Sequence, residues 1–354
     1  MRNRTGWAFL ALVSALAAQD QGKSKRALDN GIRLETERKY TEADAAFTDA
    51  IGANPQNLAA YRGRARVRLL MGQGPQAIAD LDQALTVDPN DVDSWILRGD
   101  VNANLGEPNK AIGDYTQALT LGVERATVYH ARGVERVKLG QHPAALEDLT
   151  KAIKLRLDNP APYKDRGVTY ALLGKYADAI EDYDRAIALR PDYAECYLER
   201  GYAYGQSGQF DRAVADFTSV LKFLPDNDKA FSLRGAAYQR QGKHELAVAD
   251  FSEALKRQPQ NTQLYLARAA SFVELKLLEQ ALSDRNTAVQ IEPQSPEVYV
   301  ARGGTFHMLG QHEKGLADRT QAIRLKPDFA EAYFARANAY FLLDQFGKAQ
   351  SDLQ

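Results

Sequence analysis

Hydrophobic and small residues recur along this chain with a fixed period of 34 residues. With Pro160 numbered as position 1 of a unit, the first half of the unit carries its recurring residues at positions 4, 7, 8 and 11. The second half carries them at positions 20, 24, 27 and 28. An i, i+3, i+4, i+7 spacing puts each set on one face of a helix. Each unit is therefore predicted to contain two amphipathic α-helices.

The residues between the two halves predict where each helix ends. Glycine at position 15, as in Gly174, suits a left-handed residue that closes the first helix. Proline at position 17 or 18, as in Pro75, Pro108 and Pro143, suits the first turn of the second helix, where a missing amide hydrogen costs little. Proline at position 32 ends the second helix. The unit is thus predicted to be an antiparallel helical hairpin.

The unit recurs without insertion or deletion. Nine complete repeats start at residues 24, 58, 92, 126, 160, 194, 228, 262 and 296, and a truncated tenth starts at 330. Because a lone hairpin of this size cannot bury its apolar stripe, neighbouring hairpins must stack, and self-similarity at this period indicates a solenoid.

Two pairs of residues depart from this pattern. Val123 and Leu157 replace the proline at position 32, so we expect the second helices before them to run on. Arg285 and Arg319 replace the aromatic residue at position 24 in two adjacent repeats. Loss of a buried aromatic side chain removes roughly 1.5 to 3 kcal/mol of burial, so we expect a looser region there.

A unit with an aromatic residue at positions 4 and 24, glycine or alanine at 8, alanine at 20 and 27, and proline at 32 resembles the tetratricopeptide repeat (TPR) family over residues 24–354. The resemblance implies an all-α, right-handed superhelical solenoid of antiparallel helical hairpins. It also implies a concave groove that is lined by the first helices, at positions 2, 5, 9, 12 and 13.

Carried over position by position, the resemblance puts a mixed set of side chains in the groove. The candidate partner-binding residues are Arg62, Arg66, Asp100, His130, Lys164, Tyr202, Lys229 and Arg240. Positive charge is densest near the N-terminal end, where Arg62 and Arg66 are expected to hold an acidic or extended peptide segment through charge-assisted hydrogen bonds. A solvated face, offset by Asp93 and Asp100, explains the same charges equally well.

Arginine at position 7 and aspartate at position 23 occur together in nine repeats and are both missing from the first. Opposite charges that appear and vanish together are expected to pair, within a repeat or across a junction. We predict a structural Arg–Asp ladder, which includes Arg166, Asp182, Arg200 and Asp216. A repeated row of anion-binding arginines is the functional alternative, which the recurring acidic partner disfavours.

The N-terminus has the pattern of a secretory signal. Arg2 and Arg4 precede an apolar run, Trp7 to Leu16, and a small-x-small cleavage pattern follows at residues 15–17. We predict a signal peptide over residues 1–17, a short linker over 18–23, and export to the periplasm or envelope of a bacterium. The apolar run is too short to span a bilayer, so the mature chain is expected to have no integral membrane segment. An uncleaved anchor and a fortuitous apolar start are the alternatives.

Composition and motifs disfavour other functions. A formal net charge of −1 does not suggest a nucleic-acid partner, and the single cysteine, Cys196, excludes an intramolecular disulfide. The five histidines lack metal-ligand spacing with a cysteine or carboxylate on one helix face, so no metal or other cofactor is expected. Residues 22–24 mimic only the end of a phosphate-binding loop, and no nucleophile elbow or zinc-protease pattern is complete. We therefore predict no catalytic residues and no enzyme.

The remaining expectation is a non-catalytic scaffold that binds a protein or peptide segment in the groove. One alternative is the adaptor part of a larger enzyme or secretion machine whose active domain lies beyond Gln354. Another is a self-associating structural protein. The tenth repeat stops at position 25, and an edge that exposes Tyr340, Phe346 and Leu353 is a candidate homodimer contact.

Overall fold

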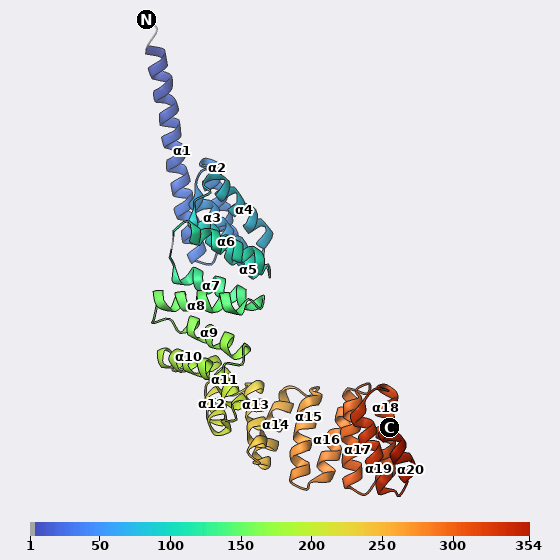
Figure 1. Ribbon diagram of the computed structural model, residues 1–354. Coiled ribbons are helices and arrows are strands. Elements are labelled where there is room, and N and C mark those ends of the chain that lie inside the picture. Colours follow the sequence, from blue (N-terminus) through green and yellow to red (C-terminus); the bar gives the residue numbers. More distant parts are fainter. Residues whose placement is uncertain (1–3, 123) are drawn as a thin grey trace. The chain divides into compact units, whose positions relative to one another are not determined.

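The computed structural model describes the backbone of residues 4–122 and 124–354, and the side chains of these residues from residue 19 onward. This described part contains twenty α-helices and no strands (Figure 1), which confirms the predicted all-α repeat fold. The predicted signal peptide, residues 1–17, lies outside the part whose side chains are described. Among the described residues, no helix is both long enough and apolar enough to cross a bilayer.

The helices alternate between the first and the second helix of a hairpin. The first helices are α1 (Arg4–Thr36), α3 (Leu58–Leu70), α5 (Val92–Asn104), α7 (Ala126–Lys138), α9 (Pro160–Leu172), α11 (Ala194–Gln206), α13 (Asp228–Arg240), α15 (Thr262–Glu274), α17 (Pro296–Met308) and α19 (Ala330–Leu342). The second helices are α2 (Tyr40–Ala53), α4 (Gly74–Val87), α6 (Pro108–Thr120), α8 (His142–Leu155), α10 (Tyr176–Leu189), α12 (Phe210–Phe223), α14 (His244–Arg257), α16 (Leu278–Ile291), α18 (His312–Leu325) and α20 (Phe346–Leu353). From α3 onward, every first helix begins at the residue where the sequence period starts a repeat.

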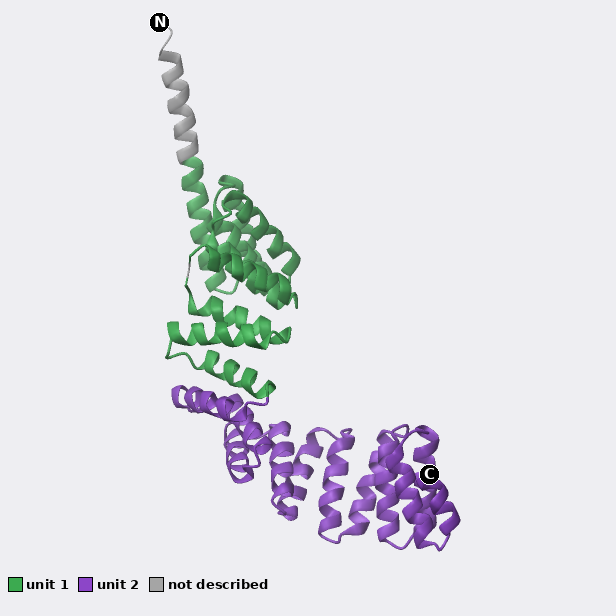
Figure 2. Cartoon of the chain, in the orientation of Figure 1, with its two compact units in different colours: residues 1–173 green, residues 174–354 purple. Residues whose placement is uncertain are grey.

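The chain forms two compact units, residues 1–173 and residues 174–354 (Figure 2). Unit 1 contains α1 to α9, and unit 2 contains α10 to α20. Within each unit, consecutive helices contact each other, and each first helix also contacts the next first helix. The first helices therefore form one layer in each unit, which is the layer that the family resemblance assigns to the groove.

Small residues let neighbouring helices approach closely around one large side chain per repeat. The ring of Phe47, at position 24 on α2, lies between Gly31 of α1 and Gly63 of α3. A Cβ atom at Gly31 would lie 2.7 Å from this ring, and one at Gly63 would lie 2.5 Å from it. Position 24 thus fills the space between the first helix of its own repeat and the first helix of the next one.

Position 15 closes the first helix in the left-handed conformation that the sequence predicted. The seven glycines there have φ between 69° and 75°. Arg38, Lys276 and Asp344 occupy the same position in the first, eighth and tenth repeats and have φ of 60°, 61° and 58°. The hydrogen bonds of the turn are the same with and without glycine. After Lys276, the amide of residue 277 donates to the carbonyl of Phe272, just as the amide of residue 243 donates to the carbonyl of Tyr238 after Gly242. The turn geometry is therefore imposed by the array and not by glycine.

Two second helices differ from the prediction. The expectation that α6 and α8 run on is wrong, because α6 ends at Thr120 and α8 ends at Leu155. Gly122 follows α6 with φ of 87°, a conformation that stops a helix without proline. Arg156 follows α8 in an extended conformation, with φ of −149°. Val123 itself lies outside the described residues.

The side chains named for the C-terminal edge differ in exposure. Tyr340 on α19 is half-buried, whereas Phe346 and Leu353 on α20 are 55% and 63% exposed. Contact with a second copy at this edge stays a prediction.

The arginines at position 7 bind the aspartates at position 23 of their own repeats. The pairs are Arg64–Asp80, Arg98–Asp114, Arg132–Asp148, Arg200–Asp216, Arg234–Asp250, Arg268–Asp284, Arg302–Asp318 and Arg336–Asp352, with N–O distances of 2.6 to 2.8 Å. Except for Asp352, these aspartates are buried. Arg166 belongs to unit 1 and Asp182 to unit 2, so their pairing stays a prediction.

The same arginines also cross the repeat junctions. Arg234 Nη1 donates to Thr218 Oγ1, at position 25 of the preceding repeat, over 3.0 Å. Arg166 makes the equivalent bond to Thr150, and Arg302 makes it to Asn286. In the hairpins whose pairs are described, the Arg–Asp ladder therefore joins the two helices, and most of its arginines also bind the hairpin before.

We expect glycine at position 15 of the eighth repeat to stabilise the protein. A Cβ atom in a left-handed conformation costs about 1 kcal/mol, so Lys276→Gly should raise the free energy of unfolding by about that amount. The reverse change at an equivalent site, Gly242→Ala, should lower it. Urea denaturation followed by circular dichroism measures both. A destabilised Lys276→Gly variant would contradict this account of the turn.

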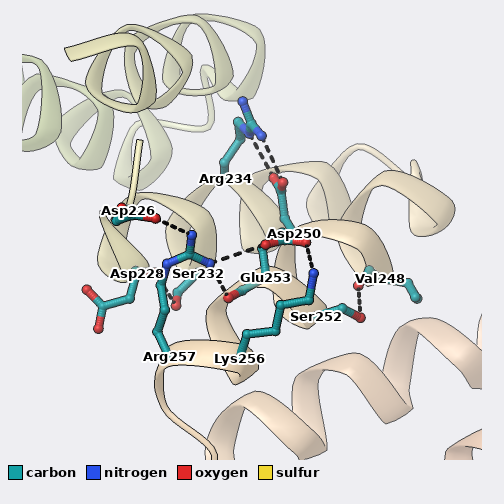
Figure 3. A network of polar contacts seen from close by, with 10 residues as sticks. All are labelled: Asp226, Asp228, Ser232, Arg234, Val248, Asp250, Ser252, Glu253, Lys256 and Arg257. Atoms are coloured by element: carbon teal, nitrogen blue, oxygen red, sulfur yellow. Dashed lines mark hydrogen bonds and ion pairs between the residues drawn. The ribbon is translucent and has the colours of Figure 1, made fainter. Parts of the chain in front are cut away.

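Removal of one ladder carboxylate should destabilise the protein strongly. Figure 3 shows Asp250 facing Arg234, and the hydrogen bonds that Arg234 donates to Asp250 raise the pKa of Arg234 above its ordinary value. Breaking a buried pair on one side costs about 3 to 5 kcal/mol, and this is the loss that we expect for Asp250→Ala in urea denaturation.

Glu253, on the same helix, is the matched control. It pairs with Lys256 and Arg257 at the surface (Figure 3), where solvent screens the charges. Glu253→Ala should therefore change stability far less than Asp250→Ala does. Equal effects of the two variants would mean that the ladder contributes no more than a surface pair.

Candidate binding surface

The two arginines expected to hold an acidic partner are already paired inside unit 1. Arg62, on α3, donates to the carboxylate of Asp91, which caps α5. Arg66 forms two hydrogen bonds of 2.9 Å with Glu35 of α1. An acidic ligand would therefore have to displace an intramolecular carboxylate from either arginine. From the sequence, Asp93 and Asp100 were expected to offset the charge of these two arginines. In the structure both acids have other partners, because Asp93 binds Arg125 and Asp100 accepts a hydrogen bond from Tyr115.

The other predicted groove cations of unit 1 share one acid. Lys164 Nζ lies 3.0 Å from Asp165 Oδ1, and His130 Nε2 lies 2.6 Å from Asp165 Oδ2. Burial opposes the charge on Asp165, but the hydrogen bonds from His130 and Lys164 outweigh it and hold the pKa of this carboxyl below its ordinary value. This part of the groove is therefore neutralised internally.

Unit 2 contains the remaining predicted groove residues, Tyr202, Lys229 and Arg240. Lys229 Nζ lies 3.9 Å from Glu199 on the preceding first helix. Arg240 is exposed, and its guanidinium lies 5.3 Å from the centroid of the Phe210 ring. Among the described acids, none lies within 4 Å of Arg240. Of the six groove cations predicted from the sequence, Arg240 is thus the one that is available to a ligand.

Arg240 stands at the rim of a pocket between α11 and α13, which we call the α11–α13 pocket. Its volume is about 350 Å³. Its lining residues are Gly201, Tyr202, Gly205, Gln206, Phe210, Phe217, Leu233, Ala236, Ala237 and Arg240. They come from the sixth and seventh repeats, and Tyr202 and Arg240 had both been assigned to the groove from the sequence.

Each wall of this pocket follows from the repeat register. Phe217 occupies position 24 and forms the floor between the two first helices, as Phe47 does in the first repeat. Gly205 occupies position 12 and has no atom within 4 Å of where its Cβ would be, so it leaves the centre of the pocket empty. Tyr202 is 42% exposed at the side. The pocket is therefore apolar at its base and has an aromatic ring and a cation at its edge.

Sequence reasoning missed this pocket because it searched for charged side chains. The sequence did contain a signal for the pocket, because a glycine at a groove position leaves space where other repeats have a side chain. Gly205 is the one glycine at position 12 in the ten repeats. Volumes of about 300 to 1,000 Å³, lined mostly by apolar groups with a few polar ones, are typical of binding pockets.

Within the described ranges, no three histidine, cysteine, aspartate or glutamate side chains gather as ligands of a metal ion. The nearest approach of two histidines is on α17 and α18, where His307 Nδ1 lies 2.7 Å from His312 Nδ1. This pair lies several repeats away from the α11–α13 pocket.

Comparison with known proteins assigns the repeat to a family. Sequence profiles described as "Tetratricopeptide repeat" match residues 34–101, 198–262 and 232–296. A profile described as "TPR repeat" matches residues 169–208. Together these matches cover more than half of the 354 residues. No curated protein sequence matches the chain at a significant level.

Solved structures agree on the fold. PilW, described as a widely conserved type IV pilus biogenesis factor, is 18% identical with a TM-score of 0.54, and the match covers 58% of this chain and 96% of PilW. A tetratricopeptide repeat protein from Parabacteroides merdae is 17% identical with a TM-score of 0.52, and the match covers 73% of this chain and 98% of that one. MamA is 26% identical over 49% of this chain and 96% of its own, with a TM-score of 0.46.

Proposed function

This chain belongs to the tetratricopeptide repeat family, and we propose that it is a non-catalytic interaction scaffold that binds an extended segment of another protein in the α11–α13 pocket. The repeats support the role of a scaffold, because proteins of this family typically bind other proteins and do not catalyse reactions. The observation that carries the choice of site is Arg240, the one predicted groove cation without an acidic neighbour among the described residues.

The proposed mode of binding follows from the two ends of the pocket. One apolar side chain of the partner occupies the space above Phe217 that Gly205 and Ala236 leave open. A neighbouring carboxylate of the partner pairs with Arg240, whose guanidinium lies over the ring of Phe210. A hydrogen bond to a charged group typically contributes about 1.5 to 3 kcal/mol, so this contact selects segments that have an acid next to an apolar residue.

Filling the pocket should abolish binding without harming the fold. Since Gly205 lies within a helix and faces empty space, Gly205→Leu adds a better helix former and blocks the pocket. Peptides selected from a random library on the wild-type protein should carry an acid beside an apolar residue. We expect them to bind Gly205→Leu undetectably and Arg240→Glu at least about tenfold more weakly, a change of roughly 1.4 kcal/mol. Isothermal titration calorimetry measures both.

Matched controls separate the pocket from the rest of the chain. Gly113, on α6, also lies within a helix and faces empty space, so Gly113→Leu should bind the same peptides as well as the wild type does. Arg66→Glu tests the N-terminal arginines in the same way. Peptides that keep their affinity for Gly205→Leu but lose it for Arg66→Glu would place binding in unit 1 and refute the proposal.

We also propose that the protein acts in the periplasm or envelope of a bacterium. The support is the N-terminal sequence alone, where Arg2 and Arg4 precede an apolar run and a small-x-small pattern. The mature protein isolated from expressing cells should then begin near residue 18. Recovery of the chain with its original N-terminus would contradict export by cleavage of this segment.

A further inference from the structure

The side chain at position 24 reaches the groove in two repeats, as Phe217 and Tyr115 show. Phe217 lines the α11–α13 pocket from below. Tyr115 Oη donates a hydrogen bond of 2.7 Å to Asp100, which occupies groove position 9 of the same repeat. The chemistry of position 24 therefore sets the chemistry of the groove floor between one first helix and the next.

In the eighth and ninth repeats this floor is made of arginine. Position 24 holds a phenylalanine, tyrosine or leucine in the other eight repeats, whereas it holds Arg285 and Arg319 here. Arg319 is only 6% exposed, and its Cγ lies 3.4 Å from where a Cβ of Gly303 would be. Arg285 is half-buried and donates from Nη1 to the carbonyl of Ala301, over 2.7 Å, and to the hydroxyl of Thr305. Arg285 thus contacts α17 through its guanidinium, from α16, and Arg319 lies against α17 through its Cγ, from α18.

Neither guanidinium has an acidic partner in the part of the chain that the structure describes. The aspartates beside them in sequence, Asp284 and Asp318, are bound through both oxygens by Arg268 and Arg302. Arg285 Nε, Arg319 Nε and Arg319 Nη1 are buried without a hydrogen-bond partner. Burial lowers the pKa of both arginines, and Asp318 offsets only part of this effect for Arg319. A buried charge without a partner is costly.

The groove is open above these arginines. Gly304, at groove position 9 of α17, is the one glycine at that position in the ten repeats. A Cβ atom there would have only Arg285 Nη1 within reach, at 4.0 Å. His307, at position 12 of the same helix, adds a further polar group, and its pKa is lowered by burial and by the nearby His312 and Arg319. We call the cluster of Arg285, Gly304, Thr305, His307 and Arg319, in which Thr305 and Arg319 are buried, the cationic recess.

We propose that the cationic recess binds an oxyanion, a carboxylate or a phosphate, over Gly304 between Arg285 and Arg319. The donors point to this chemistry, since guanidinium groups present several N–H donors and bind carboxylate and phosphate through charge-assisted hydrogen bonds. The bound anion would supply the negative charge that the surrounding helices lack. The residues of the recess lie on α16, α17 and α18, and this inference does not depend on the α11–α13 pocket.

Two sources can supply such an oxyanion, and two probes distinguish them. Inorganic phosphate represents a free anion, and an acetylated and amidated tetraglutamate peptide represents an acidic segment of a protein. Both are titrated into the full chain at constant ionic strength, with chloride as the balancing anion. Saturable binding of phosphate alone would indicate a free anion, whereas tighter binding of tetraglutamate would indicate an acidic segment. Binding of neither would overturn the proposal.

The variants use leucine, the residue that position 24 holds in three other repeats. Arg285→Leu and Arg319→Leu should each weaken binding of the effective probe at least about tenfold, roughly 1.4 kcal/mol. Without any anion added, both variants should melt at or above the temperature of the wild type, because each removes a buried charge that has no partner. A lower melting temperature of Arg319→Leu would show that the arginine is structural and would overturn the proposal.

Site-resolved controls complete the test. The ring signals of His307 in NMR spectra should move on addition of the effective probe to the wild type and stay in place in Arg319→Leu. Arg324→Leu, which removes an exposed arginine from α18, the helix of Arg319, should bind the probe as the wild type does. Loss of probe binding in Arg324→Leu would contradict the assignment to the recess.

Discussion

One side chain per repeat, at position 24, fills the space between a first helix and the first helix of the following hairpin. Phe47 shows why this contact governs the rest, because glycines on both neighbouring helices bring their backbones up to its ring. The same side chain forms the base of the groove, as Phe217 does in the α11–α13 pocket. Stacking of repeats and chemistry of the binding surface are therefore set by the same residue, and a substitution there changes both at once.

A second constraint is that most charged side chains form ion pairs with a residue of the same or a neighbouring repeat. The Arg–Asp ladder places an ion pair in most hairpins, and most of its guanidiniums also bind position 25 of the preceding repeat, as Arg234 does. Pairs such as Arg66 with Glu35 neutralise charges that face the groove. Several arginines have no acidic partner among the described residues, and most of them are exposed. Three of them, Arg240, Arg285 and Arg319, occupy groove or position-24 sites of unit 2.

The sequence predicted the parts of the fold that depend on neighbours in the chain. The 34-residue period located the start of every first helix from α3 onward, and position 15 predicted the left-handed turns. The prediction from the sequence failed where a side chain pairs with a residue far away in the chain. Arg62 and Asp91 are 29 residues apart, so the groove charge that looked free in the sequence is neutralised in the fold. The predicted extension of α6 failed for a local reason, because Gly122 stops a helix as proline does.

The two arginines at position 24 illustrate how a repeat array can contain an unfavourable residue. In a solenoid each repeat contacts only its neighbours, so the cost of a buried guanidinium remains local and the other hairpins keep their stability. The same locality places Arg285 and Arg319 against one helix, α17, where Gly304 has no side chain to cover Arg285. A hydrophobic residue at position 24 would stabilise the stack better but would leave the groove floor without charge. The geometry of this segment therefore favours binding of an anion over stability of the repeat.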